Sequence, residues 1–261
     1  MMKMNQPYFI LNQSPWPILM SLNMFNLMTS NIMMLNMKFN LFMLTNMILI
    51  LTISLLWWRD IIRESTFMGK HNFYMMNLIK FSMIMFIISE AFLFILFFWN
   101  FLHNSLSPAI ELGLNWPPKN INFFNPILIP LLNTIILLMS SFTLTLTHFY
   151  LLNNNKNQTI KFLYSTIILS MYFIILQMIE YKESTFTFSD SIFGSSFFMA
   201  TGFHGLHVII GTIFLMINLI PFYNMQISFI HHISFELASW YWHFVDIIWL
   251  FLYMTFYWWN N

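Results

Sequence analysis

Long apolar stretches separated by short polar segments dominate the chain. A membrane-crossing helix needs ~20 mostly apolar residues. The pattern predicts such helices at about 15–35, 39–62, 73–103, 127–152, 159–181, 190–222 and 232–258. Strand-like alternation and internal repeats are not visible, which argues against a β-barrel and against an inverted-repeat transporter. The pattern therefore predicts an all-α, polytopic membrane protein with seven transmembrane helices in a single membrane domain, 1–261.

The predicted helices are not equally clear. The first is the weakest, because asparagines interrupt it at Asn23, Asn26 and Asn31. The third is longer than a ~30 Å hydrocarbon core requires, so we expect it to tilt or project. At the start of the sixth, Ser189 or Asp190 is the expected N-cap, since short polar side chains can accept from the first free backbone N–H groups.

Composition supports a membrane location and excludes several classes of function. Hydrophobic residues make up 59% of the chain and charged residues only 7%, whereas soluble domains carry about 25% charged residues. The net charge of +1 provides no basic field for nucleic acid. Because there is no cysteine, disulfides, thiolate metal sites and cysteine nucleophiles are excluded.

Lysine and arginine in the polar segments predict the orientation. The chain shows no signal or transit peptide pattern at its start. Loops on the cytoplasmic or matrix side of a membrane carry the excess of basic residues. One predicted side holds Lys3, Arg59, Arg63, Lys70, Lys80, Lys156 and Lys161, and the other holds Lys38, Lys119 and Lys182. This bias places the N-terminus on the more positive side and, after seven helices, the C-terminus opposite.

Glu90 lies in the middle of the apolar segment MIMFIISEAFLFILFFW (83–99). A charge at that depth is costly, so such a residue usually has a function and a partner. Two interpretations stay open: a protonated acid that only supports helix packing, or a role with lipid, protons or a partner subunit. The nearest lysine on the same helix, Lys80, is ten residues away. We expect a neutral acid that donates one hydrogen bond, and His207 is a candidate partner from another helix.

Two histidines lie three residues apart in TGFHGLHVIIGT. His204 and His207 share a helix face at this spacing. They could bind a metal or haem, but a catalytic zinc site usually needs three protein ligands, so a structural hydrogen-bonding pair is favoured. Three glycines in the same segment are expected to let neighbouring helices approach closely: Gly202, Gly205 and Gly211.

The last predicted helix contains the polar set Glu236, His243 and Asp246. Spacings of seven and three residues place these side chains near one helix face. A proton relay, a di-metal carboxylate site and a buried ionic or hydrogen-bonded network are all compatible with that pattern. Because di-metal bundles use paired Glu and Glu-x-x-His motifs on several helices, the network is favoured.

Several long motifs occur in an order typical of a known family. They are WWRDIIRESTF (57–67), FIISEAFLFILFFWNFLHNSL (86–106), ELGLNWPP (111–118), PLLNTIILLMSS (130–141), GSSFFMATGFHGLHVIIGT (194–212) and FELASWYWHFVDIIWLFLYMTFYWW (235–259). In these motifs the chain resembles cytochrome c oxidase subunit III of animal mitochondria over nearly its whole length.

The resemblance implies a fold, a location and partners. It implies seven helices, the first two splayed from the last five around a lipid-filled cleft, with Trp58, Arg63, His71 and Glu90 matching cleft-lining positions. It implies no haem or copper in this chain, since those belong to partner subunits. The implied partners are subunit I, other complex IV subunits and phospholipids. The implied location is the mitochondrial inner membrane, with the N-terminus in the matrix and the C-terminus in the intermembrane space.

The function implied by the resemblance is support: stability, proton uptake and sustained turnover of the catalytic subunit. Two alternatives stay open from the residues alone. A small proton-coupled transporter could use Glu90, His207 and His243, although broken helices and symmetric halves would be expected. A self-contained membrane oxidoreductase would need a complete set of metal or haem ligands.

Overall fold

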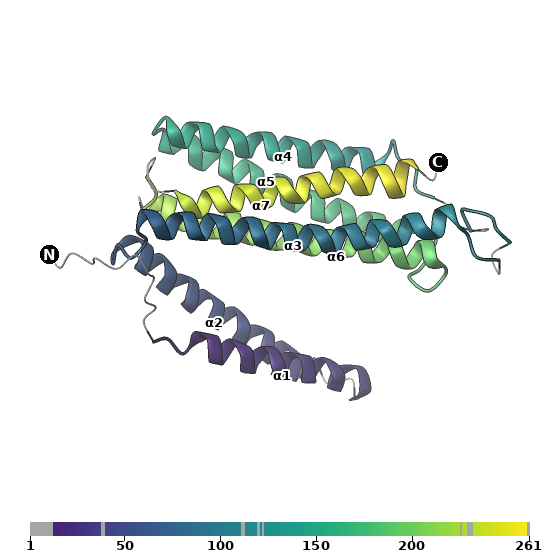
Figure 1. Ribbon diagram of the computed structural model, residues 1–261, viewed down its shortest axis with the longest axis horizontal. Helices are drawn as coiled ribbons and strands as arrows, with labels where there is room; N and C mark the ends of the chain where they lie inside the picture. The colour runs from purple at the N-terminus through teal and green to yellow at the C-terminus, as the bar shows by residue number, and fades with distance from the viewer. Residues whose placement is uncertain are drawn as a thin grey trace. The chain divides into compact units, whose positions relative to one another are not determined.

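The computed structural model describes residues 13–37, 40–110, 113–118, 121, 123–224, 226–228 and 232–259. In that part of the chain seven α-helices follow one another, and no strand occurs (Figure 1). They are α1 (Trp16–Met37), α2 (Asn40–Thr66), α3 (Phe73–Leu106), α4 (Ile129–Leu152), α5 (Lys156–Glu183), α6 (Ile192–Tyr223) and α7 (Ile233–Leu252), and the π-helix η2 (Tyr253–Trp258) continues α7. The prediction of seven helices in an all-α chain is confirmed.

Helices α1 to α6 are long and apolar enough to cross a membrane. In α7 tryptophan, tyrosine, histidine and two acids interrupt the apolar residues. Its buried side nevertheless includes large apolar side chains such as Phe235 and Leu252. The weakly marked first stretch is a regular helix of 22 residues despite its asparagines.

The chain divides into two compact units, residues 1–79 and 80–261. In the first unit α1 and α2 pack against each other as an antiparallel pair. The Trp16 indole N–H donates to Asp60 Oδ2 at 2.8 Å, and the Asn46 amide donates to the backbone carbonyl of Asn26 at 3.1 Å. Because lipid provides no hydrophobic drive between helices, such polar contacts and small buried residues hold a pair together.

In the second unit four helices form a closed ring. Helix α4 packs on α5, α5 on α6, α6 on α7, and α7 again on α4. The axes of α4 to α7 run side by side in Figure 1. From Lys80 onward α3 joins this unit, and two of its side chains, Phe94 and Phe101, are fully buried.

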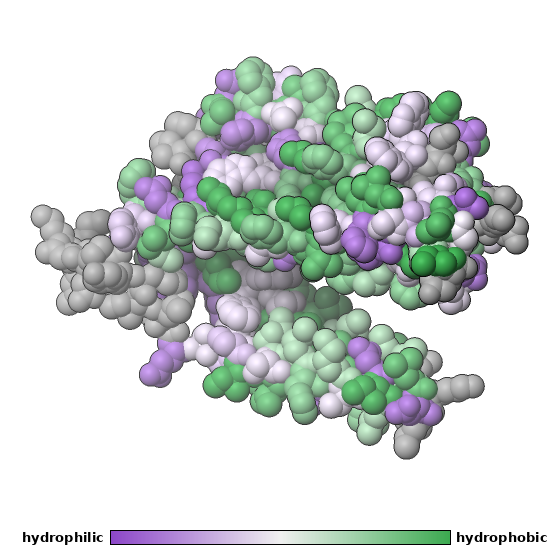
Figure 2. Space-filling model, turned by 45° about the vertical axis from the view of Figure 1, so that its right-hand side comes forward, coloured by the Kyte–Doolittle hydropathy of each residue, from purple (hydrophilic) through white to green (hydrophobic). Residues whose placement is uncertain are grey.

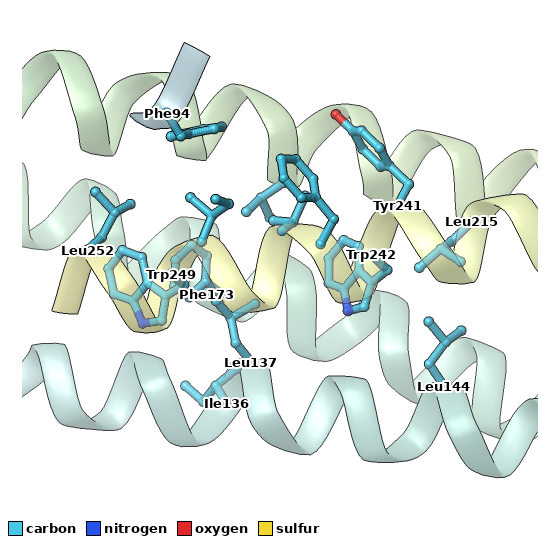
Figure 3. Close-up of a cluster of buried hydrophobic side chains, with 14 of the residues drawn as sticks. Phe94, Ile136, Leu137, Leu144, Phe173, Leu215, Tyr241, Trp242, Trp249 and Leu252 are labelled. Carbon is cyan, nitrogen blue, oxygen red and sulfur yellow. The ribbon is translucent and has the colours of Figure 1, made fainter. Parts of the chain in front are cut away.

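Aromatic and branched side chains fill the centre of the ring (Figure 3). Trp242 and Trp249 project from α7, and Phe173 of α5 meets Trp249 edge-on at a centroid distance of 4.9 Å. Leu137 and Leu144 of α4 complete this core. The outer surface is also apolar, and hydrophobic side chains cover much of the face that Figure 2 shows. A hydrocarbon environment suits a surface of this kind.

The start of α6 differs from the prediction. Ser191 is the N-cap, and its hydroxyl accepts from the Gly194 N–H at 3.1 Å. The expectation of Ser189 or Asp190 was wrong. The Asp190 carboxylate instead accepts from the Thr187 N–H at 2.6 Å and closes the preceding turn.

Candidate polar site within the helix bundle

The central polar contact joins α3 to α6. His207 Nε2 lies 3.0 Å from Glu90 Oε2. The His207 side chain is 10% exposed and that of Glu90 is 25% exposed. The candidate partner named from the sequence is therefore the residue that Glu90 contacts.

A second hydrogen bond fixes the tautomer of His207. Its Nδ1 lies 2.7 Å from the backbone carbonyl of Phe203. A carbonyl only accepts, so Nδ1 carries a proton and donates. One proton then remains for the bridge between His207 Nε2 and the Glu90 carboxyl. With that proton on Glu90 both groups are neutral, and with it on His207 they form an ion pair.

Aromatic rings surround the pair. The His207 ring meets Phe94 edge-on at 5.1 Å and stacks with Tyr241 at 6.3 Å. The imidazole thus packs between aromatic rings of α3 and α7.

His204 faces a different helix from His207. Its Nε2 lies 3.2 Å from the backbone carbonyl of Val245 on α7, and its ring packs against Trp249 at 5.0 Å. The two histidines therefore hold α6 to α7 and to α3 respectively and do not converge on one ligand.

Of the three glycines in this segment, only Gly211 lies against a neighbouring helix. A Cβ at Gly211 would lie 2.9 Å from Trp242 Cε3. A Cβ at Gly202 or Gly205 would meet no described atom within 4 Å. Close helix approach is thus concentrated at Gly211.

Glu236 forms an ion pair with Lys80. The Lys80 Nζ lies 2.7 Å from Glu236 Oε2, which joins α3 to the start of α7. Next to this pair, the rings of His232 and His148 lie 5.5 Å apart. Burial, followed by the nearby His148, lowers the pKa of His232 below its usual value of 6.5.

His243 and Asp246 do not continue the Glu236 contact. His243 Nδ1 lies 2.7 Å from the Ser141 hydroxyl of α4. Asp246 is 5% exposed and borders Ser141, but its carboxylate oxygens form no hydrogen bond of normal geometry with the described residues. The three polar residues of α7 thus divide between α3 and α4.

Three of the residues singled out from the sequence lie in the first unit. Trp58 is 38% exposed and Arg63 is exposed on the last turns of α2. His71 is partly buried in the segment before α3. Trp58 and Arg63 are thus more exposed than Glu90 and His207.

Within the described ranges, no group of three or more histidines and acids is arranged to hold a metal ion.

Sequence reasoning did not identify Lys80 as a partner of Glu236 or recognise the buried Glu180 of α5. Glu180 is fully buried. Its signal was weak, because it lies only three residues from the polar end of its helix.

Comparison with known proteins gives one consistent result. The family described as "Cytochrome c oxidase subunit III" matches residues 6–261. "Cytochrome c oxidase subunit 3" of Aedes aegypti is 51% identical over 258 residues, 98% of each chain. The protein of that name from Pisaster ochraceus is 50% identical over 256 residues, again 98% of each chain. The one from Paracentrotus lividus is 47% identical over 269 residues and covers 100% of both chains.

Proposed function

The chain belongs to the cytochrome c oxidase subunit III family, and we propose that it sustains turnover of the catalytic subunit and assists its proton uptake. Membership makes it a subunit of respiratory complex IV, a proton-translocating oxidoreductase. It also makes it a multi-pass protein of the mitochondrial inner membrane. A small proton-coupled transporter is not favoured, because the family match extends over residues 6–261.

The contact between Glu90 and His207 is the observation that best agrees with a supporting role for the chain. Their bridge holds one proton, and the Phe203 carbonyl takes the only other N–H of the imidazole. A proton-coupled transporter was expected to use His243 together with Glu90 and His207, but His243 bonds to Ser141 instead. With the shared proton on Glu90, the pair carries no charge where it borders hydrocarbon. The quarter-exposed Glu90 carboxyl can then meet a lipid ester.

The proposed means of support is bound phospholipid. In this proposal α1 and α2 are splayed from the other five helices, and lipid fills the cleft between the two groups. Trp58, Arg63, His71 and Glu90 line it, as the resemblance to the family implies. The exposure of Trp58 and Arg63 at the end of α2 supports the idea, since tryptophan and arginine favour the headgroup region.

Replacing Arg63 tests the lipid proposal. The guanidinium fork suits bidentate contact with a phosphate. Arg63→Leu is expected to lower the phospholipid bound per complex, measured by native mass spectrometry, and to shorten the period of active oxygen consumption. Lys182→Leu removes a charge from the last turn of α5 and serves as the control. Unchanged lipid content in Arg63→Leu would contradict the proposal.

The remaining parts of the proposal concern partners and orientation. We place haem and copper in the partner subunits, with subunit I as the main contact, and the absorption spectrum of the purified chain tests this. The N-terminus is proposed to lie in the matrix and the C-terminus in the intermembrane space. Three of the lysines used for that orientation, Lys3, Lys38 and Lys119, lie outside the described residues.

A further inference from the structure

A separate set of buried polar side chains lies where α4 begins and α5 ends. Asn133 of α4 and Glu180 of α5 are completely buried, and Gln177 of α5 is 6% exposed. The Tyr257 hydroxyl of η2 lies beside both the Glu180 carboxyl and the Gln177 amide. Three structural elements thus bring polar groups together inside an apolar bundle.

The direct contacts do not satisfy several of these polar atoms with normal hydrogen-bond geometry. The Asn133 amide donates to Gln177 Oε1 at 3.5 Å, which is the outer limit for a hydrogen bond. Among the described residues, Asn133 Oδ1, Gln177 Nε2 and both carboxyl oxygens of Glu180 form no hydrogen bond of normal geometry, although the Tyr257 hydroxyl lies close to Glu180 and Gln177. Buried polar groups are normally satisfied by protein or by ordered water.

The chemistry of these atoms points to their ligand. They include acceptors on Asn133 and Glu180 and a donor on Gln177. The oxygen and nitrogen of an amide side chain can be assigned either way round. If both the Asn133 and the Gln177 amides are turned over, one amide donor and one amide acceptor still remain free. Hard cations such as Ca²⁺ and Mg²⁺ take oxygen ligands, and the amide N–H would face a cation unfavourably. Water both donates and accepts, and buried waters typically make about three hydrogen bonds to such groups.

We propose that Glu180, Gln177 and Asn133 bind internal water, which bridges α4 and α5 and reaches the Tyr257 hydroxyl of η2. The weak direct contact between Asn133 and Gln177 is then reinforced by shared water. The site fastens the last turns of α5 to the start of α4. It involves none of the residues assigned to the lipid cleft or to the Glu90–His207 pair.

A high-resolution map of the intact oxidase tests the proposal directly. We expect a water peak about 2.7–3.2 Å from a Glu180 carboxyl oxygen and from the Asn133 or Gln177 amide. Direct hydrogen bonds from Glu180 to protein groups, with no such peak, would overturn it. A peak with ligand distances of about 2.0–2.6 Å and only oxygen neighbours would identify a cation and overturn it as well.

Variants provide an independent readout. Glu180→Leu and Gln177→Met remove one side of the site each, and the peak should be lost or weakened in both. Glu180→Gln keeps an acceptor and a donor and should retain it. Glu183→Gln changes the exposed acid three residues later and should leave the peak unchanged. A peak of full height in both Glu180→Leu and Gln177→Met would refute the site. If either variant fails to assemble, the wild-type map remains decisive.

Discussion

Replacing Glu90 tests how α3 is joined to α6. In Glu90→Gln the side chain keeps its shape, and its amide N–H can donate to His207 Nε2, which is an acceptor when Nδ1 carries the proton. We therefore expect Glu90→Gln to assemble and to show nearly normal initial oxygen consumption. In Glu90→Ala the imidazole nitrogen loses its partner, and the working life of the enzyme during turnover should shorten.

The size of the effect follows from the surroundings of the pair. His207 is 8% exposed and lies against Phe94 and Tyr241, so water cannot easily replace the lost partner. A buried polar group without a partner costs about 1–3 kcal/mol, whereas a retained neutral hydrogen bond keeps its net ~1 kcal/mol. Because Glu90 itself is a quarter exposed, the lower half of that range is expected for Glu90→Ala. A loss of 1.4 kcal/mol corresponds to a tenfold change in the equilibrium for detachment of α3.

Difference infrared spectroscopy of the intact enzyme reads the position of the proton. We expect a protonated C=O stretch that disappears in Glu90→Gln, since the neutral pair avoids charge separation. Ser89→Ala is the control, because the exposed Ser89 hydroxyl bonds to the Phe86 carbonyl of its own helix. A carboxylate band assigned to Glu90 at pH 7 would refute the neutral arrangement, and normal working life in Glu90→Ala would refute its structural role.

Two further predictions concern packing and pH. Gly211→Ala should lower the free energy of unfolding by about 1–3 kcal/mol, because the new Cβ would meet the fully buried Trp242. Gly205→Ala, with open space at its Cβ, should be neutral in the same thermal unfolding assay. Burial lowers the pKa of His232. The unfolded state therefore takes up the proton first, and the stability present above pH ~6.5 should be lost as the pH falls below that value. His232→Asn should flatten this part of the stability profile, whereas replacing the exposed His103 should not.

The helices could be predicted from the sequence because each is a long apolar stretch bounded by polar turns. Even the first stretch forms a helix, and one of its asparagines, Asn23, satisfies its side chain locally by donating to the Leu19 carbonyl at 2.8 Å. The N-cap of α6 could not be predicted, because three short polar residues, Ser189, Asp190 and Ser191, precede the helix and local geometry selects among them.

Pairing between helices was harder to predict than the helices themselves. Spacings of seven and three place Glu236, His243 and Asp246 along one stripe of α7. That stripe passes different neighbours along its length, so Glu236 meets Lys80 of α3 and His243 meets α4. Spacing within one helix predicts a shared face, but the partner across that face depends on how neighbouring helices are arranged.

Glu90 lies in an apolar segment because α3 requires a polar contact that fixes its rotation and height in the bundle. Apolar residues lie all around this helix, so hydrocarbon contacts alone would not select its rotation or its height. The contact of Lys80 with Glu236 on α7 and that of Glu90 with His207 on α6 lie ten residues, or ~15 Å, apart along α3. Any rotation or shift of the helix would break one of these contacts and leave a polar group unpaired. The carboxyl thus specifies one arrangement of α3 in a bundle whose packing alone would allow several.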